Sequence, residues 1–95
     1  MTVVGKTRIE QFCRRHPDAL QDALAWLAEA GEATWRTPQD IRDAYHDASF
    51  VKKHVVFHLR HNRYRLDVKV AYASGVVTVI RIGTHAEYDR WSFED

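Results

Sequence analysis

The sequence predicts an α+β fold: helices in the first half of the chain, then a small antiparallel sheet of three or four strands, then a short helix. Three observations indicate this fold class. Apolar residues recur at helical spacing before residue 47, three β-like segments occupy residues 54–60, 63–72 and 76–82, and only short turn signals separate those segments. Such connections join antiparallel strands, because a parallel crossover needs a dozen residues or more.

The length and composition indicate one globular domain over residues 1–95. A chain of 95 residues can bury a two-layer core but not two independent cores. The sequence has no apolar run long enough to span a bilayer and no signal-peptide pattern, so we expect no membrane association. Cys13 is the only cysteine, which fits a reducing cytoplasm. We expect it to be a small buried helix residue rather than a nucleophile.

The first half of the chain is expected to hold a short edge strand at residues 2–4 and three helices. The first helix covers residues 6–15, and the second covers residues 19–30 with Gly31 as its terminator. Thr37, Pro38 and Asp40 form a start signal for a third helix that runs to about residue 46. Trp26 is expected to pack against the sheet. The other residues expected on the inner sides of the helices are Ile9, Phe12, Cys13, His16, Leu20, Ala23, Leu24, Leu27, Ile41 and Tyr45.

The middle strand shows alternation of period two, which assigns one face to a core and the opposite face to several cations. The core set is Tyr64, Leu66, Val68 and Val70, and the opposite set is Arg63, Arg65, Asp67 and Lys69. In the third strand, strict alternation separates Ile80 and Ile82 from Arg81. If those isoleucines meet the helices, Arg81 joins Arg65 and Lys69 on the open face.

Turn and cap signals bound these strands. His61 and Asn62 are expected to form the first hairpin turn, since Asn tolerates left-handed geometry, and residues 73–75 are expected to form the second. Residues 84–87 have the spacing of a capping box, so a final short helix is expected to begin there. It places His85 in its first turn and Tyr88 one turn later.

The net charge of +1 hides an asymmetry along the chain. Residues 1–47 carry six Lys or Arg against eight acids, whereas residues 48–86 carry seven cations against Asp67 alone, a net of +6. The last nine residues are acidic, with a net of −3. Such a basic block is the footprint of a phosphate-binding face, and it is equally consistent with a solvated sheet face.

Several motifs resemble the signature of HigB-type toxins of bacterial toxin–antitoxin pairs. The resemblance covers nearly the whole chain, and the motifs follow the family's order. The chain departs from the family at His61, where many relatives carry glycine, which leaves the type of that turn open. The motifs are Asn62-Arg63-Tyr64-Arg65-Leu66 and Gly83-Thr84-His85-Ala86-Glu87-Tyr88-Asp89, preceded by His16-Pro17-Asp18-Ala19, Trp35 with Thr37-Pro38, and Ala48-Ser49-Phe50-Val51.

This resemblance implies a RelE/ParE-like fold, with the helices packed on one face of the small antiparallel sheet. It also implies an mRNA interferase: a ribosome-dependent endoribonuclease that cleaves translated messages, inhibits translation and growth, and uses no cofactor. The implied partners are the ribosome, mRNA and a helix-turn-helix antitoxin of the HigA type, with which the toxin oligomerises.

Four residues are the candidates for the chemistry of RNA cleavage. His85 is the candidate acid or base, because imidazole titrates near neutrality. Arg65 and Arg81 suit the phosphate, since a guanidinium offers paired donors and stays charged. Tyr88 suits stacking on a base or donating a proton. The candidates for holding the RNA backbone are Lys52, Lys53, Arg63 and Lys69.

Each assignment has a structural alternative. His85 could simply begin a helix, Tyr88 could be a core or lid residue, and the arginines could pair with Asp67, Glu87 or Asp89. His54 and His58 are expected to be packed residues. The scattered histidines give little support to a metal site.

Two other functions remain open. A ParE-like gyrase inhibitor would share the fold and need no acid–base group. A non-catalytic RNA-binding module would use the basic sheet without cutting.

Overall fold

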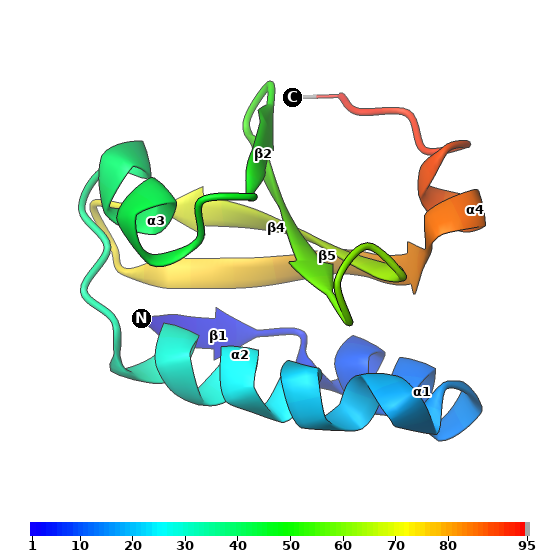
Figure 1. Ribbon diagram of the computed structural model, residues 1–95. Coiled ribbons are helices and arrows are strands. Elements are labelled where there is room, and N and C mark those ends of the chain that lie inside the picture. The colour runs from blue at the N-terminus through cyan, green and yellow to red at the C-terminus, as the bar shows by residue number, and fades with distance from the viewer. Residues whose placement is uncertain (95) are drawn as a thin grey trace.

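The computed structural model describes residues 1–94 and shows ten elements in an α+β arrangement (Figure 1). None of the helices in this range is long and apolar enough to cross a membrane. In chain order the elements are β1 (Thr2–Val4), α1 (Lys6–Arg15), the 3-10 helix η1 (Pro17–Ala19), α2 (Leu20–Glu32), α3 (Pro38–Ala44), β2 (Ser49–Val51), β3 (His54–Leu59), β4 (Tyr64–Ala71), β5 (Val76–Thr84) and α4 (His85–Tyr88).

The strands form one five-stranded mixed sheet in the order β1-β5-β4-β3-β2. The expectation of three or four antiparallel strands was therefore wrong in number and in direction. The meander β3-β4-β5 is antiparallel as expected, but β1 pairs with β5 in parallel, which α1 and α2 make possible as part of a long connection. β2 was missed because it has only three residues and pairs only with β3.

The helices α1 and α2 lie along the same face of the sheet in Figure 1. α1 has the expected bounds and buries Ile9, Phe12 and Cys13. Gly5 leads from β1 into α1 with a φ of 94°, and a Cβ there would stand 3.0 Å from the carbonyl oxygen of Val79, so the position needs glycine.

The inner face of α2 was predicted only in part. Ala23, Trp26 and Ala30 are buried, and the Trp26 ring lies 5.3 Å from that of Phe57, which confirms its packing against the sheet. Leu20 and Leu24 are instead 47% and 56% exposed, because Trp26 and the small residues hold α2 close to the strands on a different side. Gly31 does not end the helix, which continues to Glu32.

The predicted start signal of α3 and the predicted capping box of α4 are both present, and the start of α3 is also a capping box. The Thr37 hydroxyl accepts from the Asp40 amide at the start of α3, and the Thr84 hydroxyl accepts from the Glu87 amide at the start of α4. The first hairpin turn was wrong, because β3 ends at Leu59 and β4 begins at Tyr64, which leaves a four-residue connection. Its left-handed residues are Arg60 and His61.

A β-bulge in β5 corrects the predicted alternation. Asp67 pairs with Arg81 but the next residue of β4, Val68, pairs with Val79, so Ile80 is the extra residue. Val77 and Val79 therefore share the helix face, and Arg81 still reaches the opposite face. Sequence periodicity could not reveal this, because the extra residue is apolar like its neighbours. The core under the helices includes Phe57, Leu66, Val68, Val77 and Val79.

Candidate functional site

The sheet face opposite α1 and α2 is covered by the chain that follows β5. After α4, the chain turns back over the sheet towards β3 and β2 (Figure 1). Val56, His54, Arg65 and Asp67 point to this face by strand parity, and all four are buried. The covering layer consists of α4 and residues Trp91–Glu94. We call residues Trp91–Glu94 the covering segment. The predicted open face is thus largely closed by the protein itself.

A buried carboxylate organises this face. Asp67 has no exposed surface, and its two oxygens lie 2.7 Å from His54 Nδ1 and 2.9 Å from Arg81 Nε. His54 Nε2 lies 2.7 Å from the carbonyl oxygen of Glu94. A hydrogen-bond acceptor therefore faces each of the two ring nitrogens of His54. His54 is therefore a packed and fully bonded residue, as expected.

Arg81 lies on the predicted face, and its guanidinium group contacts the covering segment. Its Nη2 donates to the carbonyl oxygen of Ser92 at 2.7 Å, beside its bond to Asp67. The same group stands 4.5 Å from the ring centre of Trp91 and 4.9 Å from that of Phe93. The structural alternative of pairing with Asp67 is what the geometry shows, and a phosphate would have to displace Ser92 to bind Nη2 of Arg81.

Arg65 lies two residues before Asp67 on β4 and is also buried, with 5% of its surface exposed. Its Nη1 donates to the carbonyl oxygens of Asn62 and Tyr64, and its guanidinium lies 5.1 Å from the centre of the Tyr88 ring. Within residues 1–94 its buried Nε has no hydrogen-bond partner. The structure therefore brings together two of the predicted residues, Arg65 on β4 and Tyr88 on α4.

His85 is the first residue of α4, three residues before Tyr88. Its amide donates to the carbonyl oxygen of Arg63 at 3.0 Å, which fixes α4 to the start of β4. Its side chain is 55% exposed, and its Nδ1 lies 3.5 Å from an Asp89 oxygen. The capping box that starts the helix also lowers the pKa of Glu87, chiefly through a hydrogen bond from the Thr84 amide. An exposed imidazole next to a carboxylate can exchange protons with a bound molecule.

The four predicted backbone-binding residues are spread over two loops and a strand. Lys52 and Lys53 are exposed in the turn between β2 and β3. Arg63 is exposed but donates to Asp18 at 2.9 Å, and Lys69 is half-buried on β4. They form no single cluster with His85, although Lys69 lines a groove of about 500 Å³ together with His54 and Arg81.

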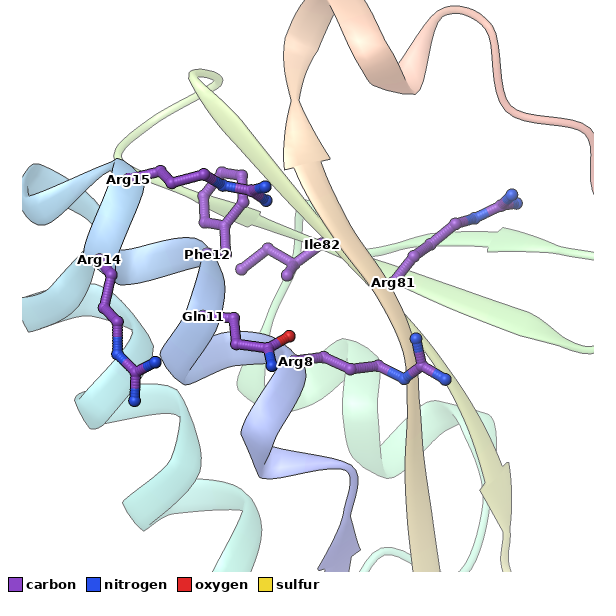
Figure 2. Close-up of a pocket in the computed structure, with 7 residues that line it drawn as sticks. All are labelled: Arg8, Gln11, Phe12, Arg14, Arg15, Arg81 and Ile82. Carbon is purple, nitrogen blue, oxygen red and sulfur yellow. The ribbon is translucent and has the colours of Figure 1, made fainter.

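A second basic surface was missed by the sequence reasoning. A groove of about 490 Å³ runs between α1 and β5, and we call it the arginine groove. It was missed because residues 1–47 together carry a net negative charge. The spacing i, i+3, i+7 of Arg8, Gln11 and Arg15 nevertheless indicates that these residues share one face of a helix. Figure 2 shows its lining residues: Arg8, Gln11, Phe12, Arg14, Arg15, Arg81 and Ile82.

The described residues offer little to a metal or to thiol chemistry. Within residues 1–94 no group of three or more His, Cys, Asp or Glu side chains is placed to hold a metal ion. Cys13 is buried against the core, and this burial raises the pKa of its thiol, which disfavours the reactive thiolate.

Comparison with models of protein families identifies a match over most of the chain. The family model HigB_toxin, described as the RelE-like toxic component of a toxin–antitoxin system, matches residues 19–91. No curated protein matches the chain. The matched residues include α2, β2 to β5 and α4, and they leave out α1.

Proposed function

The chain belongs to the HigB family of RelE-like toxins, the toxic components of toxin–antitoxin systems, and we propose that it is a ribosome-dependent endoribonuclease that cleaves mRNA without a metal. One observation carries the proposal: where β5 leads into α4, the buried Arg65 guanidinium lies 5.1 Å from the Tyr88 ring, and the exposed His85 imidazole begins the same helix. The surrounding block of residues 48–86 has a net charge of +6, which favours a polyanionic substrate.

The proposed reaction is attack of the 2′-hydroxyl on the adjacent phosphorus. The 2′-oxygen forms the new bond to phosphorus and loses its proton to a base, while the bond to the 5′-oxygen breaks and that oxygen gains a proton. His85 is the residue we assign to proton transfer, because it is exposed and Asp89 lies 3.5 Å from its Nδ1.

Arg65 and Tyr88 are assigned to the phosphate and to the flanking base. The phosphorane carries extra negative charge, and a guanidinium held by carbonyl oxygens at the start of β4 is preorganised to stabilise it. The Tyr88 ring lies against that guanidinium, and we assign the ring to stacking on the flanking base. We assign Arg81 to the same charge, on condition that Ser92 releases its Nη2. Lys52, Lys53, Arg63 and Lys69 are assigned to the RNA backbone.

The family also implies the setting of this reaction. A toxin of a toxin–antitoxin pair has an antitoxin, and we propose that it is a helix-turn-helix protein of the HigA type that oligomerises with the toxin. The proposed substrate is mRNA on the ribosome, which places the reaction in the cytoplasm.

The test compares wild type with His85→Ala after brief induction in cells, by mapping the 5′ ends of messages. We expect wild type to create new ends within translated regions and His85→Ala to lose most of them, since general acid–base catalysis typically contributes about 10²–10⁴-fold. His46→Ala is the matched control, because His46 is also exposed but lies outside the site.

Each result bears on the assignment. New ends that survive in folded His85→Ala would refute the role of His85. Growth arrest with a DNA-damage response and intact messages would indicate a gyrase inhibitor instead. Binding of RNA without any new ends in wild type would indicate a non-catalytic module.

A further inference from the structure

The arginine groove carries positive charge that the fold does not use. Arg8, Arg14 and Arg15 are exposed, and within residues 1–94 their side chains make no hydrogen bond or ion pair of 4 Å or less. Arg63 and Arg81 on the other elements each bond a carboxylate. Placing unpaired cations on one surface costs free energy through repulsion, and a bound anion would offset that cost.

The spacing on α1 directs these side chains to one surface. Arg8, Gln11 and Arg15 recur at i, i+3 and i+7, so they share a face of the helix beside β5. In Figure 2 the side chains of Arg8 and Arg15 extend from α1 towards β5, while Arg14 points away from them. No acidic residue lines the groove, although four of its seven lining residues are arginines. The groove therefore presents guanidinium and amide donors with no carboxylate in its lining, and among its arginines Arg81 bonds the carboxylate of Asp67 behind it.

The groove leads towards the proposed site. Arg81 and Ile82 line it, and β5 continues from them through Thr84 into α4, where His85 begins the helix. At a strand rise of about 3.3 Å per residue, His85 lies on the order of 10 Å beyond Ile82. The charge of Arg15 also reaches α4, because it contributes to the lowered pKa of Glu87 after the hydrogen bonds from Thr84.

From this arrangement we infer that the arginine groove binds the phosphodiester backbone of single-stranded RNA and guides the strand to α4. The inference rests on the proposed function for its substrate. Guanidinium forks match pairs of phosphate oxygens, and arginine planes also stack on unpaired bases.

The lining favours RNA over an acidic peptide. Protein partners are usually anchored by apolar or aromatic side chains in the centre of an interface. Here Phe12 is 1% exposed and Ile82 is half-buried, so neither residue is an exposed aromatic or apolar anchor. Backbone phosphates need only charge and hydrogen-bond donors, which is what the groove supplies.

The test is binding of a fluorescent 2′-O-methyl RNA of about twelve nucleotides, a length within the usual site sizes for single strands. The methyl group blocks attack by the 2′-oxygen, so this result does not depend on whether the protein cleaves RNA. Arg8→Gln/Arg15→Gln is compared with Arg36→Gln/Arg90→Gln, which removes the same charge from exposed residues outside the groove. Thermal melting followed by circular dichroism checks that both variants fold.

We expect the groove variant to bind on the order of tenfold more weakly and the salt slope of its affinity to fall by about 1.4, for two lost phosphate contacts. The control should keep most of the slope. Equal affinity and slope in the two variants would overturn the inference. Loss of binding to poly-glutamate with unchanged RNA binding would overturn it in favour of an acidic protein. The same variants are also tested for binding to ribosomes that carry no mRNA. If the groove variant loses binding to these ribosomes but still binds the RNA oligonucleotide, the single-strand assignment is overturned in favour of folded ribosomal RNA.

Discussion

The two faces of the sheet are closed by different means. On one face, α1 and α2 cover apolar strand residues such as Leu66 and Val68, which have no exposed surface. On the other face, α4 and the covering segment lie over Asp67, which is equally buried. Apolar packing is non-directional and changes gradually with area, whereas each buried charge depends on particular partners. The second face is therefore the one that a single substitution or a competing ligand can open.

The covering segment is bound by bonds that a nucleic acid can also make. The carbonyl oxygens of Ser92 and Glu94 accept from Arg81 and His54. A ligand that displaces the segment has to offer acceptors to the same donors, and phosphate oxygens do so. On the helix face the buried strand residues are mainly apolar, and the Tyr64 hydroxyl, which donates to Asp18, bonds another part of the core layer rather than a returning tail, which fits the role of this face as the structural core.

Asp67→Ala is expected to have the largest effect on stability. It leaves Arg81 without its carboxylate and His54 without the partner of its Nδ1. Removing one member of a buried ion pair typically costs about 3–5 kcal/mol, because the remaining charge stays buried and unpaired. The free energy of unfolding is measured by urea denaturation at neutral pH.

Leu66→Ala on the neighbouring residue tests whether the two faces differ as described. Its loss of about 2–5 kcal/mol should come from a cavity under the helices and leave the covering segment in place. Only Asp67→Ala should raise the rate at which diethyl pyrocarbonate modifies His54. A loss below about 1 kcal/mol in Asp67→Ala would show that water readily replaces the carboxylate.

Gly83→Ala is expected to disturb the second face with a smaller effect. A Cβ on Gly83 would stand 2.8 Å from a ring carbon of Trp91 and 3.2 Å from the Cβ of Glu87. Both must shift, and overpacking of this kind typically costs about 1–3 kcal/mol. Quenching of tryptophan fluorescence by iodide should increase as Trp91 moves outward.

Gly31→Ala is the matched glycine substitution on the helix side. It lies within α2, and a Cβ there meets no atom within 4 Å. Alanine favours a helix interior over glycine by up to about 1 kcal/mol, so this variant should be more stable than wild type. If both alanine variants were neutral, the contact of Trp91 with Gly83 would not constrain the second face.

Much of this architecture followed from local sequence signals. The helix α1, the three strands of the meander and the start signals of α3 and α4 could be predicted, since each depends on periodicity or on residues a few positions apart. The parallel pairing of β1 and the extra residue Ile80 could not, because both are set by contacts across the sheet. The exposed Leu20 and Leu24 were misplaced for the same reason.

The sequence predicted which residues lie at the candidate site better than it predicted the bonds that these residues make. The alternation of β4 correctly put Arg65 and Asp67 on the face opposite Leu66. Nothing local indicated that Ser92 and Glu94 return to bond Arg81 and His54, since these contacts span 11 and 40 residues.

The smallest expected effect is a difference in acid sensitivity between the two faces. The Tyr64 hydroxyl, 2.6 Å away, and then Arg63 lower the pKa of Asp18 on the helix side, and the Thr84 amide lowers that of Glu87 in α4. A carboxyl with a lower pKa in the folded state stabilises the fold above its unfolded pKa, and this stabilisation is lost as the pH falls through the folded pKa. Stability should therefore decline below about pH 4.5.

Asp18→Asn and Glu87→Gln separate the two contributions to this decline. Each variant should be less stable than wild type at pH 7 and show a shallower loss between about pH 4.5 and pH 2.5, since the substituted group no longer takes up a proton. Glu32→Gln, at the exposed end of α2, should follow the wild-type curve. A wild-type slope in Asp18→Asn with a flattened slope in Glu87→Gln would place the acid-sensitive contact at α4 alone, and the helix face would then be closed without help from its carboxylates.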